Sequence, residues 1–316
     1  MMSNDYAEGL GRYSHDVLIH DTDEQLVDAV WSFVRTGLSS GGNVLVHSDE
    51  RRVALLRDAL GTHPRLEYGL DRDLYQSPMA TLFDYQRAMR QDSSGRARWV
   101  TGTVPMTEGP ATPAAWARYE SAVNEALGSF PFHALCTYDT QALPAHVVAA
   151  ARATHPHVSD GTTRGPSPDY LDPGEFLTSP LAETPAAPVG TPTLAFTLQS
   201  PVDLAAARRL IRSGAATTTA PAKSREDLLA AASEVLANAV EHGGPPVDVE
   251  VWAEAGESRL TCRVTDHGGG IANTMAGYRY PDSRSALGLW VARQLCEDLV
   301  IGEGPDGGCS VLLLVA

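Results

Sequence analysis

A proline-rich stretch at residues 156–192 divides the chain into two parts with different patterns. It holds eight of the 21 prolines, along with many Thr, Ser, Gly and Ala, and helical periodicity disappears across it. This composition is typical of a linker that is semi-extended where proline is dense. Two groups inside it, Tyr170-Leu171 and Glu175-Phe176-Leu177, are candidates to dock on the preceding part. We therefore expect a first domain at 13–155, a linker at 156–192 and a second domain at 193–316.

The first part alternates short apolar strands with helical patterns. Strands are expected at Asp16–His20, Asn43–His47, Leu66–Gly69, Ala97–Thr103 and Ala134–Asp139. Helices are expected at Glu24–Ser39, Glu50–Gly61, Ser77–Gln91, Thr112–Gly128 and Pro144–Thr154. Thr22-Asp23-Glu24-Gln25 has the form of a capping box, and Gly37, Gly61 and Gly128 are placed as helix stops. The alternation predicts an α/β domain with a mostly parallel sheet and helices on both faces.

Ligands of such sheets bind at the carboxyl ends of the strands. Polar residues stand there in four places: His20-Asp21, His47-Ser48-Asp49, Gly102-Thr103 and Tyr138-Asp139. No Gly-x-x-x-x-Gly-Lys-Ser/Thr or Gly-x-Gly-x-x-Gly sequence follows any of these strands, so phosphate binding is not expected in this part.

The histidines of the first part admit two interpretations. We favour ordinary strand-end histidines for His15, His20 and His47, and ligand or metal contact is the alternative, because three histidines in sequence do not establish proximity. His155-Pro156-His157 is interpreted as a helix exit and not as a metal site.

Charge and cysteine usage narrow the classes of partner. The net charge of −15 and a pI near 5 argue against direct binding to nucleic acid or to an anionic membrane surface. The four scattered cysteines suggest neither a disulfide framework nor a zinc knuckle. No signal peptide or apolar run long enough to span a membrane is present, so we expect a cytoplasmic protein with protein or small-molecule partners.

The second part contains an amphipathic helix that leads to Asn238. Its apolar residues recur with the 3.6 period, and Glu234, Asn238, Glu241 and His242 share the opposite face. The amide oxygen of Asn238 suits Mg²⁺, which prefers oxygen ligands. Glu234, one turn earlier, is placed to act as a general base.

A strand follows, in which Leu260, Cys262 and Val264 alternate with polar residues, and it ends at Asp266. The Asp266 carboxylate can accept a hydrogen bond from an exocyclic amine. Gly268 and Gly270 permit positive-φ turns that bring backbone close to a ligand. The alternative for this helix and strand is a solvated polar helix face followed by an ordinary glycine turn.

Together, Glu234-Val235-Leu236-Ala237-Asn238 and Asp266-His267-Gly268-Gly269-Gly270 resemble the N box and G1 box of the Bergerat-fold (GHKL) ATPases. Gly288-Leu289-Trp290 resembles the G2 box, with Ala286 where that family usually has its first glycine. The resemblance implies a two-layer α/β sandwich that binds ATP and Mg²⁺, with Asn238 as the metal ligand and Asp266 reading adenine. It also implies that Gly268, Gly270, Gly288 and Leu289 shape the pocket. Arg279 and Arg284, in the segment corresponding to the ATP lid, become candidates for γ-phosphate contact.

The order of elements distinguishes branches of that superfamily. Residues 193–232 contain no histidine, so no phospho-accepting His precedes the N-box helix as it would in a histidine kinase. The strand at Leu194–Leu198, the helix at Val202–Ser213 and the segment Ser224–Ala239 resemble the anti-sigma-factor serine kinases. This resemblance implies a kinase that sequesters a sigma factor and phosphorylates an anti-anti-sigma protein, with Glu234 as base, and that is generally a dimer.

The first part resembles another family, the MEDS sensory domains. The resemblance is carried by His15–His20, by Gly37–Val46 and by Cys136-Thr137-Tyr138-Asp139, and it covers roughly residues 13–175. It implies a small organic ligand. Two other functions remain open for the whole chain: a non-catalytic partner-binding module, and a kinase acting on His or Asp of another chain.

Overall fold

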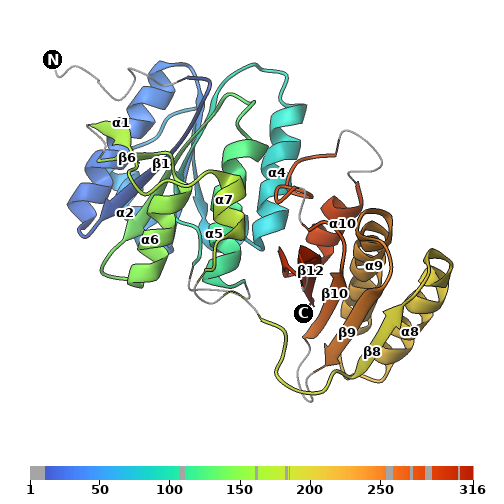
Figure 1. The fold of residues 1–316 in the computed structure, drawn as a ribbon. Helices are drawn as coiled ribbons and strands as arrows, with labels where there is room; N and C mark the ends of the chain where they lie inside the picture. Colours follow the sequence, from blue (N-terminus) through green and yellow to red (C-terminus); the bar gives the residue numbers. More distant parts are fainter. Residues whose placement is uncertain are drawn as a thin grey trace. The chain divides into compact units, whose positions relative to one another are not determined.

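The computed structural model describes residues 11–106, 111–160, 163–181, 184, 186–253, 259–270, 273–281, 287–304 and 307–315. The chain divides into two compact units, residues 1–183 and 184–316, which are described separately (Figure 1). Within the described residues, no helix is both long and apolar enough to cross a membrane.

The first unit is built on a sheet with strand order β3-β2-β4-β5-β1-β6-β7, parallel except for the β6–β7 pair. Its strands are β1 (Tyr13–His20), β2 (Asn43–Ser48), β3 (Leu66–Leu70), β4 (Arg98–Gly102), β5 (Phe132–Asp139), β6 (His157–Ser159) and β7 (Arg164–Pro166). Its helices are α1 (Asp23–Ser39), α2 (Glu50–Leu60), α3 (Asp71–Leu74), α4 (Pro78–Gln91), α5 (Pro113–Ala126), α6 (Ala145–Thr154) and α7 (Pro173–Thr178). The five strands and five helices expected from the sequence are all present, and the mostly parallel sheet is confirmed.

Helices cover both faces of this sheet, as expected. Helix α1 packs with α2, whereas α5 packs with α4, α6 and α7 (Figure 1). Thr22 caps α1 by accepting a hydrogen bond from the Gln25 N–H, and the Gln25 side chain accepts from the N–H of Asp21. The capping box thus forms with its return bond shifted by one residue.

One glycine assignment was wrong. Gly37 lies inside α1, which continues to Ser39. A Cβ atom at Gly37 would lie 2.8 Å from the Trp99 ring, so this glycine allows β4 to pack closely under the helix. Gly61, in contrast, is the C-cap of α2 with a φ of 70°, as expected of a helix stop.

The stretch expected to be a linker contains ordered elements of the first unit. Strand β6 pairs with β1, β7 pairs with β6, and the Phe176 side chain of α7 is buried. The Leu171 N–H also donates to the Ala153 carbonyl. These short elements were not predicted because the segment is rich in proline and has no periodicity. They are stabilised by contacts with residues far away in the sequence.

The second unit has two layers: an antiparallel sheet of order β11-β12-β10-β9-β8, and helices packed on it (Figure 1). The strands are β8 (Leu194–Leu198), β9 (Val247–Ala253), β10 (Leu260–Asp266), β11 (Asp298–Glu303) and β12 (Cys309–Val315). The helices are η2 (Pro201–Asp203), α8 (Leu204–Ala216), α9 (Ala222–Asn238), η3 (Ala239–Gly243) and α10 (Leu287–Leu295). This architecture confirms the expected two-layer sandwich.

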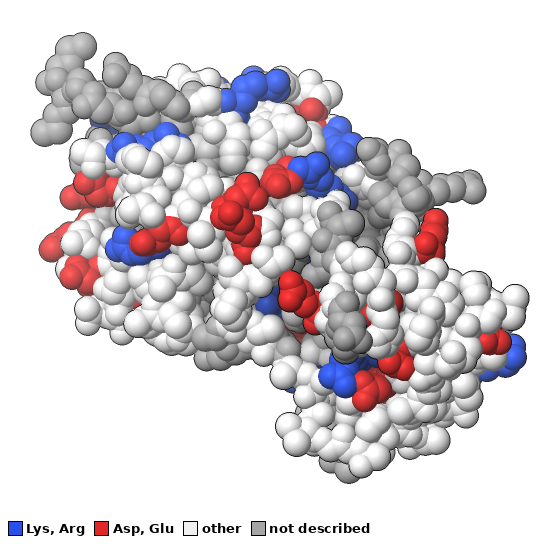
Figure 2. Space-filling model, viewed as in Figure 1, with Lys and Arg blue, Asp and Glu red and all other residues white. Residues whose placement is uncertain are grey.

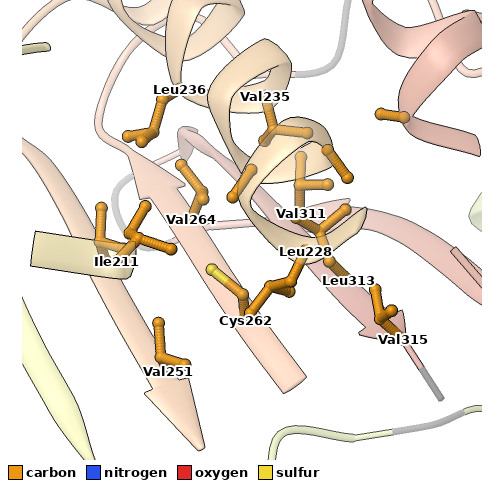
Figure 3. Packing of buried hydrophobic residues seen from close by; sticks show 14 of the residues in the cluster. Ile211, Leu228, Val235, Leu236, Val251, Cys262, Val264, Val311, Leu313 and Val315 are labelled. Atoms are coloured by element: carbon orange, nitrogen blue, oxygen red, sulfur yellow. The ribbon is translucent and has the colours of Figure 1, made fainter. Parts of the chain in front are cut away.

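Alternate residues of the sheet face the helices and form one core. Leu228, Val235 and Leu236 of α9 pack over Cys262 and Val264 of β10 (Figure 3). Neighbouring strands and α8 complete the cluster with Ile211, Val251, Val311, Leu313 and Val315. Thr261 and Thr265 are buried as well, so β10 is a central strand with little exposure on either face, not the half-buried strand expected.

On the face shown in Figure 2, acidic and basic side chains of the described residues are interspersed among wide areas of uncharged surface. That face shows no broad basic area among the described residues.

The first unit carries a pH-sensitive histidine, from which a prediction follows. His133 stacks on Trp99 with ring centroids 4.2 Å apart, and its Nδ1 lies 2.9 Å from Ser14 Oγ. Burial lowers the pKa of His133 to about 4; Asp16 opposes this shift and Arg164 adds to it. The pKa of His133 is lower in the folded protein than in the unfolded chain. The contribution of neutral His133 to stability is therefore present above the unfolded pKa and is lost as pH falls toward 4.

The free energy of unfolding of the wild type should fall between roughly pH 7 and pH 5. We expect this fall to be about 1–2 kcal/mol smaller in His133→Gln. Urea unfolding at both pH values measures this difference. The matched control is His63→Gln, at an exposed position, which should leave the pH dependence as in the wild type. Identical pH dependence in His133→Gln and wild type would contradict the prediction.

Candidate functional site

The end of helix α9 presents Glu234 and Asn238. Leu228, Val235 and Leu236 bury the helix against the sheet, while Glu234 and Asn238 are only partly buried and lie one turn apart. After Asn238 the helix widens into the π turn η3, in which the Gly244 N–H donates to the Ala239 carbonyl at 2.9 Å. The shared face expected for residues 234–242 therefore breaks at Asn238, because a π turn changes the angular spacing of the side chains that follow.

Asp266, at the end of β10, is held by backbone amides. Its Oδ1 accepts from the Gly268 N–H at 3.0 Å and from the Cys309 N–H at 3.3 Å, and the residue is 7 % exposed. Both hydrogen bonds end on Oδ1, and together they fix the orientation of the carboxylate. The side chain is thereby oriented before any ligand arrives.

Three glycines bring three segments of backbone together around Asp266. A Cβ atom on Gly243 would lie 2.3 Å from Asp266 Cγ, and one on Gly308 would lie 2.0 Å from the Asp266 carbonyl oxygen. A Cβ atom on Gly268 would lie 2.5 Å from the Gly243 Cα atom. The π turn, the loop after β10 and the turn before β12 can meet at Asp266 only because these positions lack side chains.

The two glycines expected to adopt positive φ differ from each other. Gly270 has a φ of 79° and lies close to the Gly307 carbonyl. Gly268 is not in the positive-φ region; its requirement for glycine comes from the close approach to Gly243.

The start of α10 lies against Glu234. A Cβ atom on Gly288 would lie 2.8 Å from Glu234 Oε2, so the carboxylate is next to the first turn of that helix. Gly277 lies similarly close to α10, because a Cβ atom on Gly277 would lie 2.7 Å from the Leu289 carbonyl oxygen. Arg284 and Ala286 lie outside the described residues.

Sequence reasoning missed Arg293 of α10, which anchors the described part of the expected lid, residues 273–281. Its Nε donates to the Ala276 carbonyl at 3.0 Å and its Nη1 to the Leu299 carbonyl at 2.9 Å. The guanidinium also lies 3.7 Å from the centre of the Tyr278 ring. One buried arginine thus joins the lid segment, α10 and β11.

We expect Arg293→Met to destabilise the second unit by about 2–3 kcal/mol, because the buried carbonyls lose charge-assisted donors. The segment at 273–281 should become more sensitive to proteolysis. Urea unfolding and limited proteolysis measure the two effects, and Gln294→Met, at the exposed neighbouring position, is the control. Equal stability of the two variants would show that the arginine contacts contribute nothing measurable.

The structure brings the predicted residues together in two groups. Asp266 and Gly268 lie at the end of η3, whereas Glu234 lies beside Gly288. Asn238 is the last residue of α9, one turn after Glu234. Gly243 and Gly308 were not predicted as site residues from the sequence; their only signal is that each belongs to a glycine pair, Gly243-Gly244 or Gly307-Gly308.

Comparison with protein families matches both units. Residues 14–156 match MEDS, the methanogen/methylotroph, DcmR sensory domain, and residues 198–314 match the histidine kinase-like ATPase domain. The chain joins a MEDS domain to a histidine kinase-like ATPase domain. Both resemblances inferred from the motifs are confirmed.

Among solved structures, the chain is similar to the RsbU and RsbW domains of Rv1364c from Mycobacterium tuberculosis. The identity is 26 %, the match covers 38 % of this chain and 31 % of that one, and the TM-score is 0.29. The match therefore spans about a third of the length of that chain. A comparison with curated proteins found no match.

The MEDS domain has a cavity of about 590 Å³ at the carboxyl end of its sheet. Residues at the carboxyl ends of three strands line it: Asp49 directly after β2, Thr103 directly after β4 and Asp139 as the last residue of β5. Two further lining residues contact His47: its Nδ1 lies 2.6 Å from Asp71 Oδ1 and its Nε2 lies 3.0 Å from the Tyr75 hydroxyl. Three of the four polar groups predicted at this edge contribute lining residues, and His20-Asp21 does not.

Proposed function

We propose that the ATPase domain binds magnesium-ATP and transfers phosphate to a serine of a separate protein. The observation that carries the proposal is the preorganised Asp266 carboxylate, held by two backbone N–H groups where three glycine-lined segments meet. The match of residues 198–314 to the histidine kinase-like ATPase domain supports it.

The residues present fit such a ligand. Asp266 would accept a hydrogen bond from the exocyclic amine of adenine with the oxygen that the backbone amides leave available. Gly268 and Gly270, which lack side chains, would let the backbone approach the base. Asn238 offers its amide oxygen to Mg²⁺, and Gly288, Leu289 and Arg284 would contact the phosphates. When bound, magnesium-ATP supplies the phosphoryl group and charge neutralisation for the transfer.

Glu234 is the group we assign as general base. Its carboxylate lies beside Gly288 at the start of α10, on the phosphate side of the proposed pocket. There its oxygen would accept the proton from the attacking serine hydroxyl as the bond to phosphorus forms.

The regulatory part of the proposal follows the anti-sigma-factor kinases. We propose that the chain sequesters a sigma factor, phosphorylates an anti-anti-sigma protein and forms a homodimer. The lack of histidine in residues 193–232 supports transfer to another chain. Residues 179–192 would then serve as the connection between the MEDS and ATPase domains.

Calorimetry with magnesium-ATP tests nucleotide binding. We expect saturable binding to the wild type, loss of detectable binding in Asn238→Ala, and unchanged binding in Glu226→Ala, an exposed position earlier on α9. The absence of binding heat with the wild type, confirmed by a displacement assay, would exclude the ATP-dependent function.

A second experiment separates the functional alternatives. Pull-down with and without ATP should recover a sigma factor or a small anti-anti-sigma protein, and light scattering on the same sample gives the oligomeric state. Acid-stable phosphate on a recovered serine supports the proposal. ATP binding without any phosphate transfer favours a non-catalytic module, and acid-labile phosphate indicates a histidine or aspartate kinase.

For the MEDS domain we propose a sensory role in which a small organic molecule occupies the 590 Å³ cavity. A thermal-shift screen of small alcohols, aldehydes and acids would identify it. Any stabilising compound should lose its effect in Gln76→Trp, which places a bulky ring at an exposed lining position. A compound that stabilises both proteins equally binds elsewhere.

A further inference from the structure

Four potential metal ligands converge inside the MEDS domain, and none of them lines the cavity. His15 lies on β1, Glu120 on α5, Cys136 on β5 and His155 directly after α6. One ligand atom from each lies within 4.8 Å of all the others. His15, Glu120 and His155 are at most 1 % exposed, and Cys136 is partly exposed.

The hydrogen bonds of His155 direct a lone pair into this cluster. Its Nδ1 lies 2.7 Å from the Ala151 carbonyl, so Nδ1 carries the proton and donates it. In the neutral ring Nε2 is then an acceptor. That atom is buried without a hydrogen-bond partner, 3.6 Å from Glu120 Oε2.

His15 is oriented in the same way by Asn124. The Asn124 amide nitrogen donates to the Thr154 carbonyl at 2.7 Å, which leaves its oxygen to accept from His15 Nδ1 at 3.1 Å. The lone pair of a neutral His15 therefore points from Nε2 toward Glu120 Oε2, 2.9 Å away. Two acceptors facing each other at this distance in a buried site need a proton or a metal ion between them.

We propose that His15, Glu120, Cys136 and His155 form a tetrahedral site for one divalent transition-metal ion of the zinc class. Imidazole nitrogen, thiolate sulfur and carboxylate oxygen all serve as ligands of Zn²⁺, whereas Mg²⁺ and Ca²⁺ prefer all-oxygen sites. Donor atoms of such a tetrahedron lie about 3.3–3.6 Å apart. Cys136 Sγ lies 3.5 Å from His15 Nε2 and 3.8 Å from Glu120 Oε2, close to this range, whereas the His15–Glu120 pair at 2.9 Å must widen.

The outer contacts support the same assignment. Histidine ligands of metals usually donate their second N–H to a carbonyl or carboxylate, as His155 and His15 do here. The Glu120 carboxylate accepts a further bond from the Tyr138 hydroxyl at 3.3 Å. The four residues are scattered over the sequence, and only the pairing of β1 with β5 and the packing of α5 and α6 bring them together.

Cobalt(II) titration of the chelator-treated full-length protein tests the site. We expect uptake of one equivalent, with the intense visible bands of four-coordinate cobalt and a near-ultraviolet thiolate-to-cobalt band, both abolished by one equivalent of Zn²⁺. Cys136→Ser should remove the thiolate band, and Asn124→Leu should weaken binding by about 10–100-fold. Cys309→Ser, a partly exposed cysteine of the ATPase domain, should match the wild type.

A measurement on the wild type alone guards against variants that fail to fold. Zn²⁺ should slow the alkylation of Cys136 and leave the alkylation rate of Cys309 unchanged. Peptide mass spectrometry measures both rates. Absence of saturable cobalt uptake by the wild type, or equal alkylation of Cys136 with and without Zn²⁺, would overturn the proposal and leave a proton as the cation between His15 and Glu120.

Discussion

Asp266→Asn is expected to weaken magnesium-ATP binding by about 100-fold while leaving the ATPase domain folded. Asparagine keeps an oxygen at the Oδ1 position, so the bonds from the Gly268 and Cys309 N–H groups can persist. The second oxygen, however, becomes an NH₂ group. A donor then faces the exocyclic amine of adenine, which is itself a donor, and the buried pair cannot form a hydrogen bond.

Inosine triphosphate makes this prediction sharper, because its base carries a carbonyl where adenine carries the amine. Wild type should prefer ATP, and Asp266→Asn should shift the preference toward inosine triphosphate. Asp248→Asn, on neighbouring β9, is the carboxylate control and should keep the wild-type preference. Competition binding gives both affinities on one scale. An unchanged preference in Asp266→Asn would mean that this carboxylate does not contact the base.

Gly268→Ala is expected to destabilise the second unit by about 1–3 kcal/mol and to abolish nucleotide binding. The added methyl group would lie 2.5 Å from both the Cα and the carbonyl oxygen of Gly243. Both are backbone atoms, so relief requires the loop after β10 to separate from the π turn. That movement would displace Asp266 from the N–H groups that hold it.

The adjacent residue provides a matched control for the glycine prediction. A Cβ atom on Gly269 would meet nothing within 4 Å, and its φ lies outside the positive region. Gly269→Ala should therefore retain wild-type stability in urea and wild-type ATP affinity. If both alanine variants behaved alike, close approach to Gly243 could not be the reason for glycine at position 268.

The strands and helices of both units could be predicted because their periodicity is local. Leu260, Cys262 and Val264 alternate at the period of a strand, and the apolar positions of α9 recur at the period of a helix. Short elements such as β6 and α7 were missed, since their stability comes from β1 and α5 and not from their own composition. The π turn after Asn238 likewise has no periodicity signal of its own.

The ATPase motifs could be found because their chemistry lies in short, contiguous runs. Asp266, Gly268 and Gly270 occupy one turn, and Glu234 and Asn238 occupy one helix face. The reason that Gly268 must be glycine could not be found in this way, because the atom that excludes a side chain belongs to Gly243.

The sequence by itself determined the two families, the order of their elements and the residues proposed to bind nucleotide. Tertiary structure alone decided which distant atoms meet: Gly243 and Gly308 at Asp266, and His15, Glu120, Cys136 and His155 inside the MEDS domain. The physical reason is that periodicity sets which face of an element a side chain occupies, whereas strand pairing and helix packing set what lies opposite that face.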